Sequence, residues 1–336
     1  MTRLSQHLIT LAAVLSLSGA ASAASGDKIV VGYQTGADPF EVSIAKGTLA
    51  KATGQDVEFR KFNSGADIFA AIASGDVQVG YVGSSPFAAA ASRGLDVKAF
   101  YIPSISGTDE ALVVRNGSGI KSAADLKGKR LSAAPVSTDH YQLLATLKQN
   151  GISEKDATVL ALPQPEIVAA YNRGDLDGAF VWDPALSELK KNGTVLLTSK
   201  QVAEAGAPTF NAWVATAKFI KGNPDFLKSF AAEVAKENGS FLNDKAAWAE
   251  ESDNVKAIAK LIGGTPKDQA AGLKDLNLLP ASAQATEAWL GGGEKSGVAK
   301  ILKETAVFLK EQKKITAMRD SYASFVTAEF VTPLSN

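Results

Sequence analysis

The sequence contains no cysteine. Disulfides, thiolate metal ligands, a cysteine nucleophile and a lipid-modified cysteine are therefore excluded. Histidine is almost as scarce, because the chain has two and only His140 lies outside the N-terminal segment. No spacing of histidine, aspartate and glutamate is typical of a metal site. We therefore expect neither a metal nor a cofactor.

The chain also lacks an excess of charge of either sign. Lysine plus arginine and aspartate plus glutamate number 35 each, so the formal net charge is +0 at pH 7. A protein that binds nucleic acid usually carries a basic patch or stripe. Nucleic acid is therefore not expected as a partner.

Beyond the N-terminal segment, no stretch is apolar enough to cross a membrane. That segment has a weakly basic start with Arg3, an apolar run over residues 8–17, and then Ala21-Ser22-Ala23, a small-x-small cleavage pattern. The run is short for a membrane anchor, so we expect a signal peptide over residues 1–23 that is cleaved after Ala23. Without a cysteine for lipid attachment, the exported protein is predicted to be periplasmic, with full secretion as the alternative.

What the sequence does contain is a segment that occurs twice. AAIASGDVQVGYV (residues 70–82) leads into GSSP, and AAYNRGDLDGAFV (residues 169–181) leads into WDP. Each copy predicts a helix end, a Gly-Asp turn, a short apolar strand and a proline near the start of a new helix. If the copies lie in two similar lobes, their strand tips can face each other across a cleft.

Apolar and polar segments alternate along most of the chain, which is long enough for two domains. Outside the repeat, strands are predicted at residues 28–33, 55–62, 97–102, 130–134, 158–162 and 211–216. Helices are predicted at residues 39–53, from a cap at Ser64 to Ser74, from Pro86 onward, and at 137–150. From residue 223 the pattern is nearly all helical, with glycine breaks at 263–264 and 291–293. Alternating units of this length predict an α/β fold with parallel-rich sheets flanked by helices.

The apolar run at residues 111–115 ends in Asn-Gly-Ser-Gly, which marks a crossing into a second lobe. We assign residues 24–112 and 211–336 to lobe 1, with a helical C-terminal extension, and residues 113–210 to lobe 2. Four helix starts, at 34–39, 83–86, 135–140 and 181–184, place polar residues just past an apolar strand. Ligands bind at such places in open α/β sheets, and a helix N-terminus favours an anion. The sequence thus predicts a two-lobed binder of a small anion.

These segments resemble the nitrate/sulfonate/taurine group of periplasmic substrate-binding proteins, and most closely its taurine-binding members. The matching stretches are VGYQT (31–35), RKFNSGA (60–66), SGDVQ (74–78), GSSP (83–86), EALVV (110–114), STDHY (137–141), RGDLDGA (173–179) and GAPT (206–209). The resemblance implies a type II-like fold whose lobes close by a hinge motion, and a monomer. It also implies delivery of the ligand to a membrane permease that is driven by a separate ATPase.

The candidate ligand contacts lie at strand tips, helix starts or the lobe crossings. They are Gln34, Ser84, Ser85, Glu110, Ser137, Thr138, His140, Trp182, Asp183 and Asn211. The serines are expected to hold an anionic head, although each also fits an ordinary helix cap. For His140 a structural imidazole, and for Trp182 a core position, are the alternatives.

One departure from the family pattern concerns the ligand's cation. A taurine binder is expected to place a carboxylate near position 211, where this chain has Asn211. We expect Glu110 and Asp183 to neutralise the ammonium instead, with Trp182 over the methylene link. A plain alkanesulfonate or a related small anion is the alternative ligand.

An enzyme is the rival class of function. Pyrimidine-forming enzymes of thiamin synthesis share this fold, but they rely on segments rich in histidine and cysteine. Ser137, Asp139 and His140 are neighbours in the sequence rather than a triad assembled across a fold. Gly83-Ser84-Ser85 lacks the last glycine of a nucleophile elbow. We therefore expect binding without catalysis. A third possible function, a sensor that docks on a membrane receptor, has no distinguishing mark in the sequence.

Overall fold

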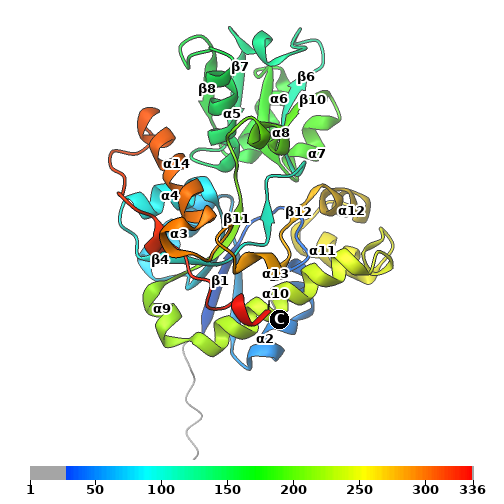
Figure 1. The fold of residues 1–336 in the computed structure, drawn as a ribbon. Helices are drawn as coiled ribbons and strands as arrows, with labels where there is room; N and C mark the ends of the chain where they lie inside the picture. Colours follow the sequence, from blue (N-terminus) through cyan, green and yellow to red (C-terminus); the bar gives the residue numbers. More distant parts are fainter. Residues whose placement is uncertain (1–27, 335–336) are drawn as a thin grey trace, which may run out of the picture.

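The computed structural model describes residues 28–334 and shows two α/β lobes, one above the other in Figure 1. Each lobe has a five-stranded sheet flanked by helices. The predicted α/β architecture is confirmed. The predicted signal peptide lies outside the described residues.

The sheet of lobe 1 has the strand order β2-β1-β3-β11-β4. Its strands are β1 (Ile29–Tyr33), β2 (Val57–Lys61), β3 (Val79–Gly83), β4 (Val97–Tyr101) and β11 (Asn211–Thr216). β1 pairs in parallel with β2 and β3, and β11 runs antiparallel between β3 and β4. The chain therefore returns from lobe 2 to lobe 1 as β11, an interior strand of the lobe 1 sheet.

The sheet of lobe 2 repeats this plan, with the order β10-β6-β9-β7-β8. Its strands are β6 (Glu110–Arg115), β7 (Arg130–Ala133), β8 (Thr158–Ala161), β9 (Gly178–Trp182) and β10 (Gly193–Thr198). β7 pairs in parallel with β8 and β9, and β6 runs antiparallel between β9 and β10. β3 and β9, the strands of the repeated segment, thus hold the same central place in the two sheets.

The turn that precedes β3 and β9 explains the Gly-Asp pair in each copy. Gly75 and Gly174 end their helices with φ of 88° and 83°, in the left-handed region that glycine adopts readily. The amides of Asp76 and Asp175 then donate to the carbonyls of Ala71 and Ala170, five residues back. The same local chemistry therefore turns the chain from helix into strand in both lobes.

Helices cover the faces of both sheets and form the C-terminal extension. In lobe 1 before the crossing they are α1 (Glu41–Lys46), α2 (Thr48–Thr53), α3 (Gly65–Ser74) and α4 (Ser84–Ser92). Lobe 2 has α5 (Thr138–Gln149), α6 (Gln164–Arg173), α7 (Ala185–Lys190) and α8 (Ser199–Glu204). The rest are α9 (Ala217–Gly222), α10 (Pro224–Asn243), α11 (Asp253–Ile262), α12 (Pro266–Asp275), α13 (Ala281–Gln284) and α14 (Gly297–Glu311). A short pair, β5 (Ser104–Ile105) with β12 (Asn277–Leu278), ties the extension to the crossing.

Two predicted boundaries differ from the structure. The single helix predicted over residues 39–53 is two helices, because Gly47 adopts φ of 64° and separates α1 from α2. The crossing into lobe 2 comes earlier than the predicted boundary after Leu112, since all of β6 from Glu110 onward pairs within the second sheet.

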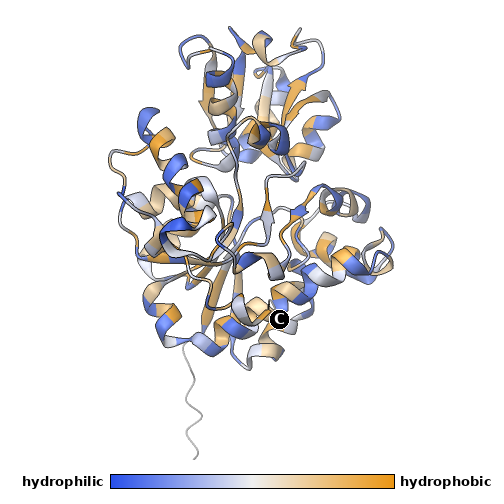
Figure 2. Cartoon of the chain, in the orientation of Figure 1, coloured by the Kyte–Doolittle hydropathy of each residue, from blue (hydrophilic) through white to orange (hydrophobic). Residues whose placement is uncertain are grey.

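Each lobe buries its own core. In lobe 1 the rings of Phe40, Trp213 and Phe230 lie 4.8 to 5.0 Å apart between centroids. In lobe 2, Leu131 and Phe180 are fully buried. Figure 2 shows the apolar residues concentrated on the strands and on the inward faces of the helices.

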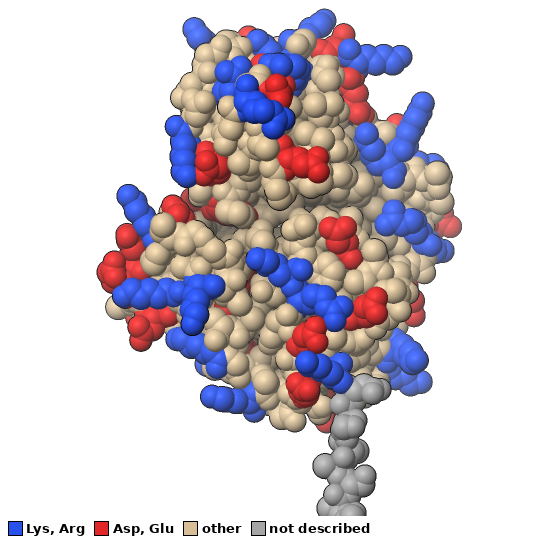
Figure 3. All heavy atoms as spheres, turned by 180° about the vertical axis from the view of Figure 1, so that it is seen from behind, with Lys and Arg blue, Asp and Glu red and all other residues tan. Residues whose placement is uncertain are grey.

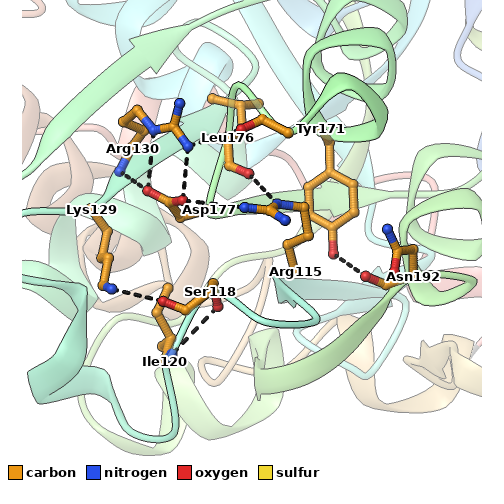
Figure 4. A network of polar contacts seen from close by, with 10 residues as sticks. Arg115, Ser118, Ile120, Lys129, Arg130, Tyr171, Leu176, Asp177 and Asn192 are labelled. Atoms are coloured by element: carbon orange, nitrogen blue, oxygen red, sulfur yellow. Dashed lines mark hydrogen bonds and ion pairs between the residues drawn. The ribbon is translucent and has the colours of Figure 1, made fainter.

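A polar network joins the strands at one end of the lobe 2 sheet (Figure 4). This is the end where the parallel strands begin, opposite their carboxyl ends. Asp177, just before β9, accepts two hydrogen bonds from the Arg130 guanidinium at the start of β7, at 3.0 and 3.3 Å. Arg115, at the end of β6, donates to the Leu176 carbonyl at 3.1 Å and lies 3.7 Å from Asp177. These contacts join the ends of three adjacent strands, so the basic residues here stabilise the fold.

The surface carries both signs of charge in a mixed pattern, which Figure 3 shows for the back of the molecule. Among the residues that the structure describes, no helix combines the length and apolar character required to cross a bilayer.

Candidate functional site

A cavity lies between the two lobes and encloses about 690 Å³, its open mouth included. Seven of the ten predicted contact residues line it, namely Gln34, Glu110, Ser137, Thr138, Trp182, Asp183 and Asn211. Both lobes contribute to the wall, as the positions of the repeated strands predict.

Three helices begin at the cavity wall. The lining includes Ser64, Gly65 and Ala66 at the start of α3, Gly83 and Pro86 at α4, and Ser137 and Thr138 at α5. Within residues 28–334, no acceptor is found for the amides of Gly65, Ala66 and Thr138. Free first-turn amides and the positive end of the helix dipole make such a place favourable for an anion.

Serine hydroxyls cap two of these helices. Ser64 Oγ accepts from the Asp67 amide at 3.2 Å, and Ser137 Oγ accepts from the His140 amide at 3.0 Å. Ser137 Oγ also donates to the Ala134 carbonyl at 2.7 Å. The caps hold the helix starts in place and leave the first amides of each helix for a ligand.

Carboxyl groups line another part of the cavity. They are Asp109, Glu110 and Asp183. Thr138 Oγ1 donates to Glu110 Oε1 at 2.7 Å, and Asp183 Oδ1 accepts from the Ser187 amide at 2.8 Å. No lysine or arginine is among the described residues that line the cavity. The wall therefore combines acidic side chains with neutral donors.

Burial changes the acidity of these groups. It raises the pKa of Glu110 to about 7, even though the hydroxyl of Thr138 acts in the opposite direction. Burial, followed by the charge of Glu110, holds the pKa of Asp109 well above its ordinary range. A cation placed beside these carboxyls would favour their ionised forms.

Two further predicted lining residues, Gln34 and Asn211, are held by the scaffold. Gln34 Nε2 donates to the Tyr81 carbonyl at 3.1 Å, and Asn211 Nδ2 donates to Ser104 Oγ at 3.1 Å. Both amide groups thus use a donor on the protein and keep an oxygen that can accept a hydrogen bond.

The two lobes approach each other closely around the cavity. A Cβ added to Gly83 would lie 2.8 Å from Thr138 Cγ2, and one added to Gly272 would lie 2.9 Å from Asp183 Oδ2. Glycine at these positions allows two lobe 2 side chains to contact the backbone of lobe 1. The lobes therefore meet on two sides of the cavity.

Three predicted contact residues do not line the cavity. Ser84 is fully buried and its Oγ accepts from the Phe210 amide at 3.4 Å, while Ser85 is fully buried as well. His140 is buried with its Nδ1 accepting from the Val136 amide at 3.1 Å. The structure thus places His140 in the structural role that was the alternative for it.

Other lining residues were not predicted. Asp109 adjoins Glu110, and its position at the lobe crossing was the available signal. Ser64 was predicted as a cap, but its helix start was not assigned to the site. Tyr81 lines the cavity and its hydroxyl donates to Asp38 Oδ2 at 3.3 Å; the strand pattern around Tyr81 gave no such indication.

Comparison with known proteins points to one group. Residues 42–240 match the family described as NMT1/THI5 like. The chain is 40% identical over 303 residues to the taurine-binding periplasmic protein of Escherichia coli (strain K12). The alignment covers 90% of this chain and 92% of that protein. It is 30% identical over 241 residues to a putative aliphatic sulfonates-binding protein of Bacillus subtilis (strain 168), covering 68% of this chain and 72% of that protein.

A solved structure has the same fold. The crystal structure of the periplasmic aliphatic sulphonate binding protein from Escherichia coli superposes with a TM-score of 0.72 at 20% identity. The superposition covers 91% of this chain and 99% of that one.

Proposed function

Because the chain belongs to the NMT1/THI5-like family, among its periplasmic substrate-binding proteins, we propose that it captures taurine between its lobes for an ATP-driven importer. The 40% identity to a taurine-binding protein supports this choice of ligand. The chemistry of the cavity supports it independently.

One observation carries the proposal: the cavity combines helix N-termini and carboxyl groups, and its described lining includes no basic side chain. Taurine is a zwitterion with a sulfonate at one end and an ammonium at the other. The sulfonate binds at the starts of α3 and α5, where the amides of Gly65, Ala66 and Thr138 are free to donate. The ammonium binds beside Glu110 and Asp183.

A plain anion fits this wall less well. It would leave the buried carboxylate of Glu110 with no positive partner, and an uncompensated buried charge is strongly unfavourable. Asn211 is neutral, but its amide oxygen adds an acceptor for the ammonium. Trp182 offers an aromatic face to the same cation.

The decisive experiment compares taurine with ethanesulfonate, which has no amine, by isothermal titration calorimetry. Glu110→Gln and Asp183→Asn are each expected to weaken taurine roughly 10- to 150-fold, the equivalent of about 1.5–3 kcal/mol for a hydrogen bond to a charged group. Both variants should bind ethanesulfonate with the affinity of the wild type or more tightly. Glu204→Gln, at an exposed carboxylate on α8, is the matched control.

Equal losses for both ligands would assign the carboxylates to structure and make a plain alkanesulfonate the better ligand. The bound ligand should be recovered unchanged after long incubation, since the protein is proposed to bind without chemistry. A product formed in proportion to protein would instead support the enzyme alternative.

The proposed site of action is the periplasm. Cleavage after Ala23 would release a mature chain that begins at Ala24, as the Ala21-Ser22-Ala23 pattern predicts. The intact mass of the exported protein measures this directly, and a mature form that keeps residues 8–17 would contradict it. There the monomeric protein would close by a hinge between lobes and pass its ligand to a permease with its ATPase.

A further inference from the structure

Two buried carboxyl groups lie side by side behind the proposed ammonium site. Asp139, in the first turn of α5, is fully buried, and Glu110, the first residue of β6, is 8% exposed. When both groups are ionised, no donor within residues 28–334 reaches either carboxylate oxygen of Asp139 or Oε2 of Glu110. With one proton between them, the two side chains form a hydrogen bond to each other.

The charges around this pair are negative. Asp109 acts on Asp139 from the segment before β6, and Asp183 and Asp275 act in turn on Asp109. His140 follows Asp139 on α5, but its Nδ1 accepts from the Val136 amide, and burial lowers its pKa to about 4. Within residues 28–334 no cation is among the groups that act on the pair, so at least one of the two carboxyls keeps its proton at neutral pH.

The surroundings decide which residue keeps that proton. Glu110 lines the cavity and accepts from Thr138 Oγ1, so its charge is stabilised on two sides. Asp139 does not line the cavity and has no donor of its own. Burial, with the charges of Glu110 and Asp109, raises the pKa of Asp139 well above its ordinary range. The dipole of α5 favours a charge on Asp139, but more weakly than burial beside a second carboxylate opposes it.

We propose that Asp139 is a positioning residue for ligand recognition, acting as a neutral acid that donates a hydrogen bond to Glu110. This bond and the one from Thr138 hold the Glu110 carboxylate toward the cavity with a single negative charge. The role of this carboxylate in binding rests on the proposed function, in which the ammonium of taurine is its partner.

Two substitutions separate a neutral donor from a second anion. Asp139→Asn keeps the shape and a permanent N–H donor, so it mimics a protonated acid. It is expected to bind taurine within about threefold of the wild type, whereas Asp139→Val, which cannot donate, loses at least about tenfold. Glu110→Gln is the reference for losing a charge at this site.

A second measurement needs no ligand. The infrared difference spectrum between the ligand-free wild type and Asp139→Asn, recorded at pH 8.5, should show the loss of one C=O stretch of a protonated carboxylic acid. Burial also raises the pKa of Asp109 and of Glu41, but their bands are present in both proteins and cancel in the difference. This reading remains valid if Asp139→Val fails to fold, and it does not depend on whether taurine is the ligand. Failure of the wild type to bind taurine would overturn the proposed function and leave the infrared result standing.

Two results would overturn the role of Asp139. A loss in Asp139→Asn as large as that in Glu110→Gln would show that Asp139 acts as an anion. An unchanged affinity in Asp139→Val, or a difference spectrum in which Asp139→Asn loses no acid band, would show that Asp139 donates nothing to Glu110.

Discussion

At the scale of single residues, His140 shows how a helix start that lines the cavity between the lobes is itself supported. Val136 has φ of 58°, a left-handed conformation that a β-branched residue rarely adopts. The amide of Val136 donates to His140 Nδ1 one helical turn further on. The imidazole therefore stabilises the strained turn that leads into α5, and it can do so only while Nδ1 is unprotonated.

This role predicts a loss of stability in acid. Burial, assisted by the charge of Lys314, lowers the pKa of His140 from 6.5 to about 4, so the folded protein binds this proton less readily than the unfolded chain does. The contribution of His140 is thus complete above pH 6.5 and is lost as the pH falls toward 4. It amounts to about 3 kcal/mol at about 1.4 kcal/mol per pKa unit.

His140→Asn is the matched variant, because its amide oxygen can accept the Val136 hydrogen bond without titrating. Urea unfolding at pH 7 and pH 4 should show the free energy of unfolding of the wild type falling by about 3 kcal/mol more than that of His140→Asn. Parallel losses in the two proteins would mean that the imidazole does not titrate in this way.

The residues of the site could be predicted where a local signal marked them. A helix start just past an apolar strand pointed to Gln34, Trp182 and Asp183, and the family resemblance pointed to Asn211; all four line the cavity. The same signal could not separate Ser137, which lines the cavity, from Ser84 and Ser85, which are buried beside it. The start of α4 also lines the cavity, through Gly83 and Pro86, so that distinction depends on which way each serine side chain points from its helix start.

At the scale of helices and strands, the repeat allowed the equivalence of β3 and β9 to be predicted, because a Gly-Asp turn and an apolar strand are local features. The antiparallel places of β6 and β11 depend on how the chain crosses between lobes, and no local pattern encodes them. The break between α1 and α2 was missed since a glycine inside a helical pattern, such as Gly47, is often tolerated.

Helix α14 illustrates the same limit. Its helical periodicity predicted a packed helix but not its partners. It packs against α4 of lobe 1, and its end reaches lobe 2, where Phe308 contacts Tyr141 edge to face at 5.1 Å between centroids. Glu311 pairs with Lys148 at 2.8 Å. The C-terminal extension therefore contacts both lobes, which the sequence pattern alone does not reveal.

At the scale of the whole molecule, the burial of acidic groups links folding, protonation and binding. Burial raises the pKa of Asp38 to about 6 and that of Glu110 to about 7. A carboxyl whose pKa is raised on folding holds its proton more tightly in the folded state. Its contribution to the stability of the ligand-free protein is therefore complete below its unfolded pKa of about 4 and is lost as the pH rises through these values.

A cationic ligand reverses this relation at Glu110. The ammonium of taurine favours the ionised carboxylate, so the pKa of Glu110 is lower in the complex than in the ligand-free protein. Binding below pH 7 then releases a proton, and the affinity for taurine falls as the pH is lowered. The dissociation constant should rise by up to about tenfold per pH unit below 7 and level off above it.

Calorimetry between pH 5.5 and pH 8.5, in two buffers of different ionisation enthalpy, measures both the dissociation constant and the protons released. At pH 6 the wild type should release up to one proton per taurine bound. Glu110→Gln should bind weakly with little dependence on pH, because the group that titrates has been removed. Glu204→Gln should keep the full dependence, since that carboxylate is exposed and does not line the cavity. A wild-type affinity that is flat from pH 5.5 to 8.5, or a Glu110→Gln profile as steep as the wild type, would show that the ammonium does not bind at this carboxylate.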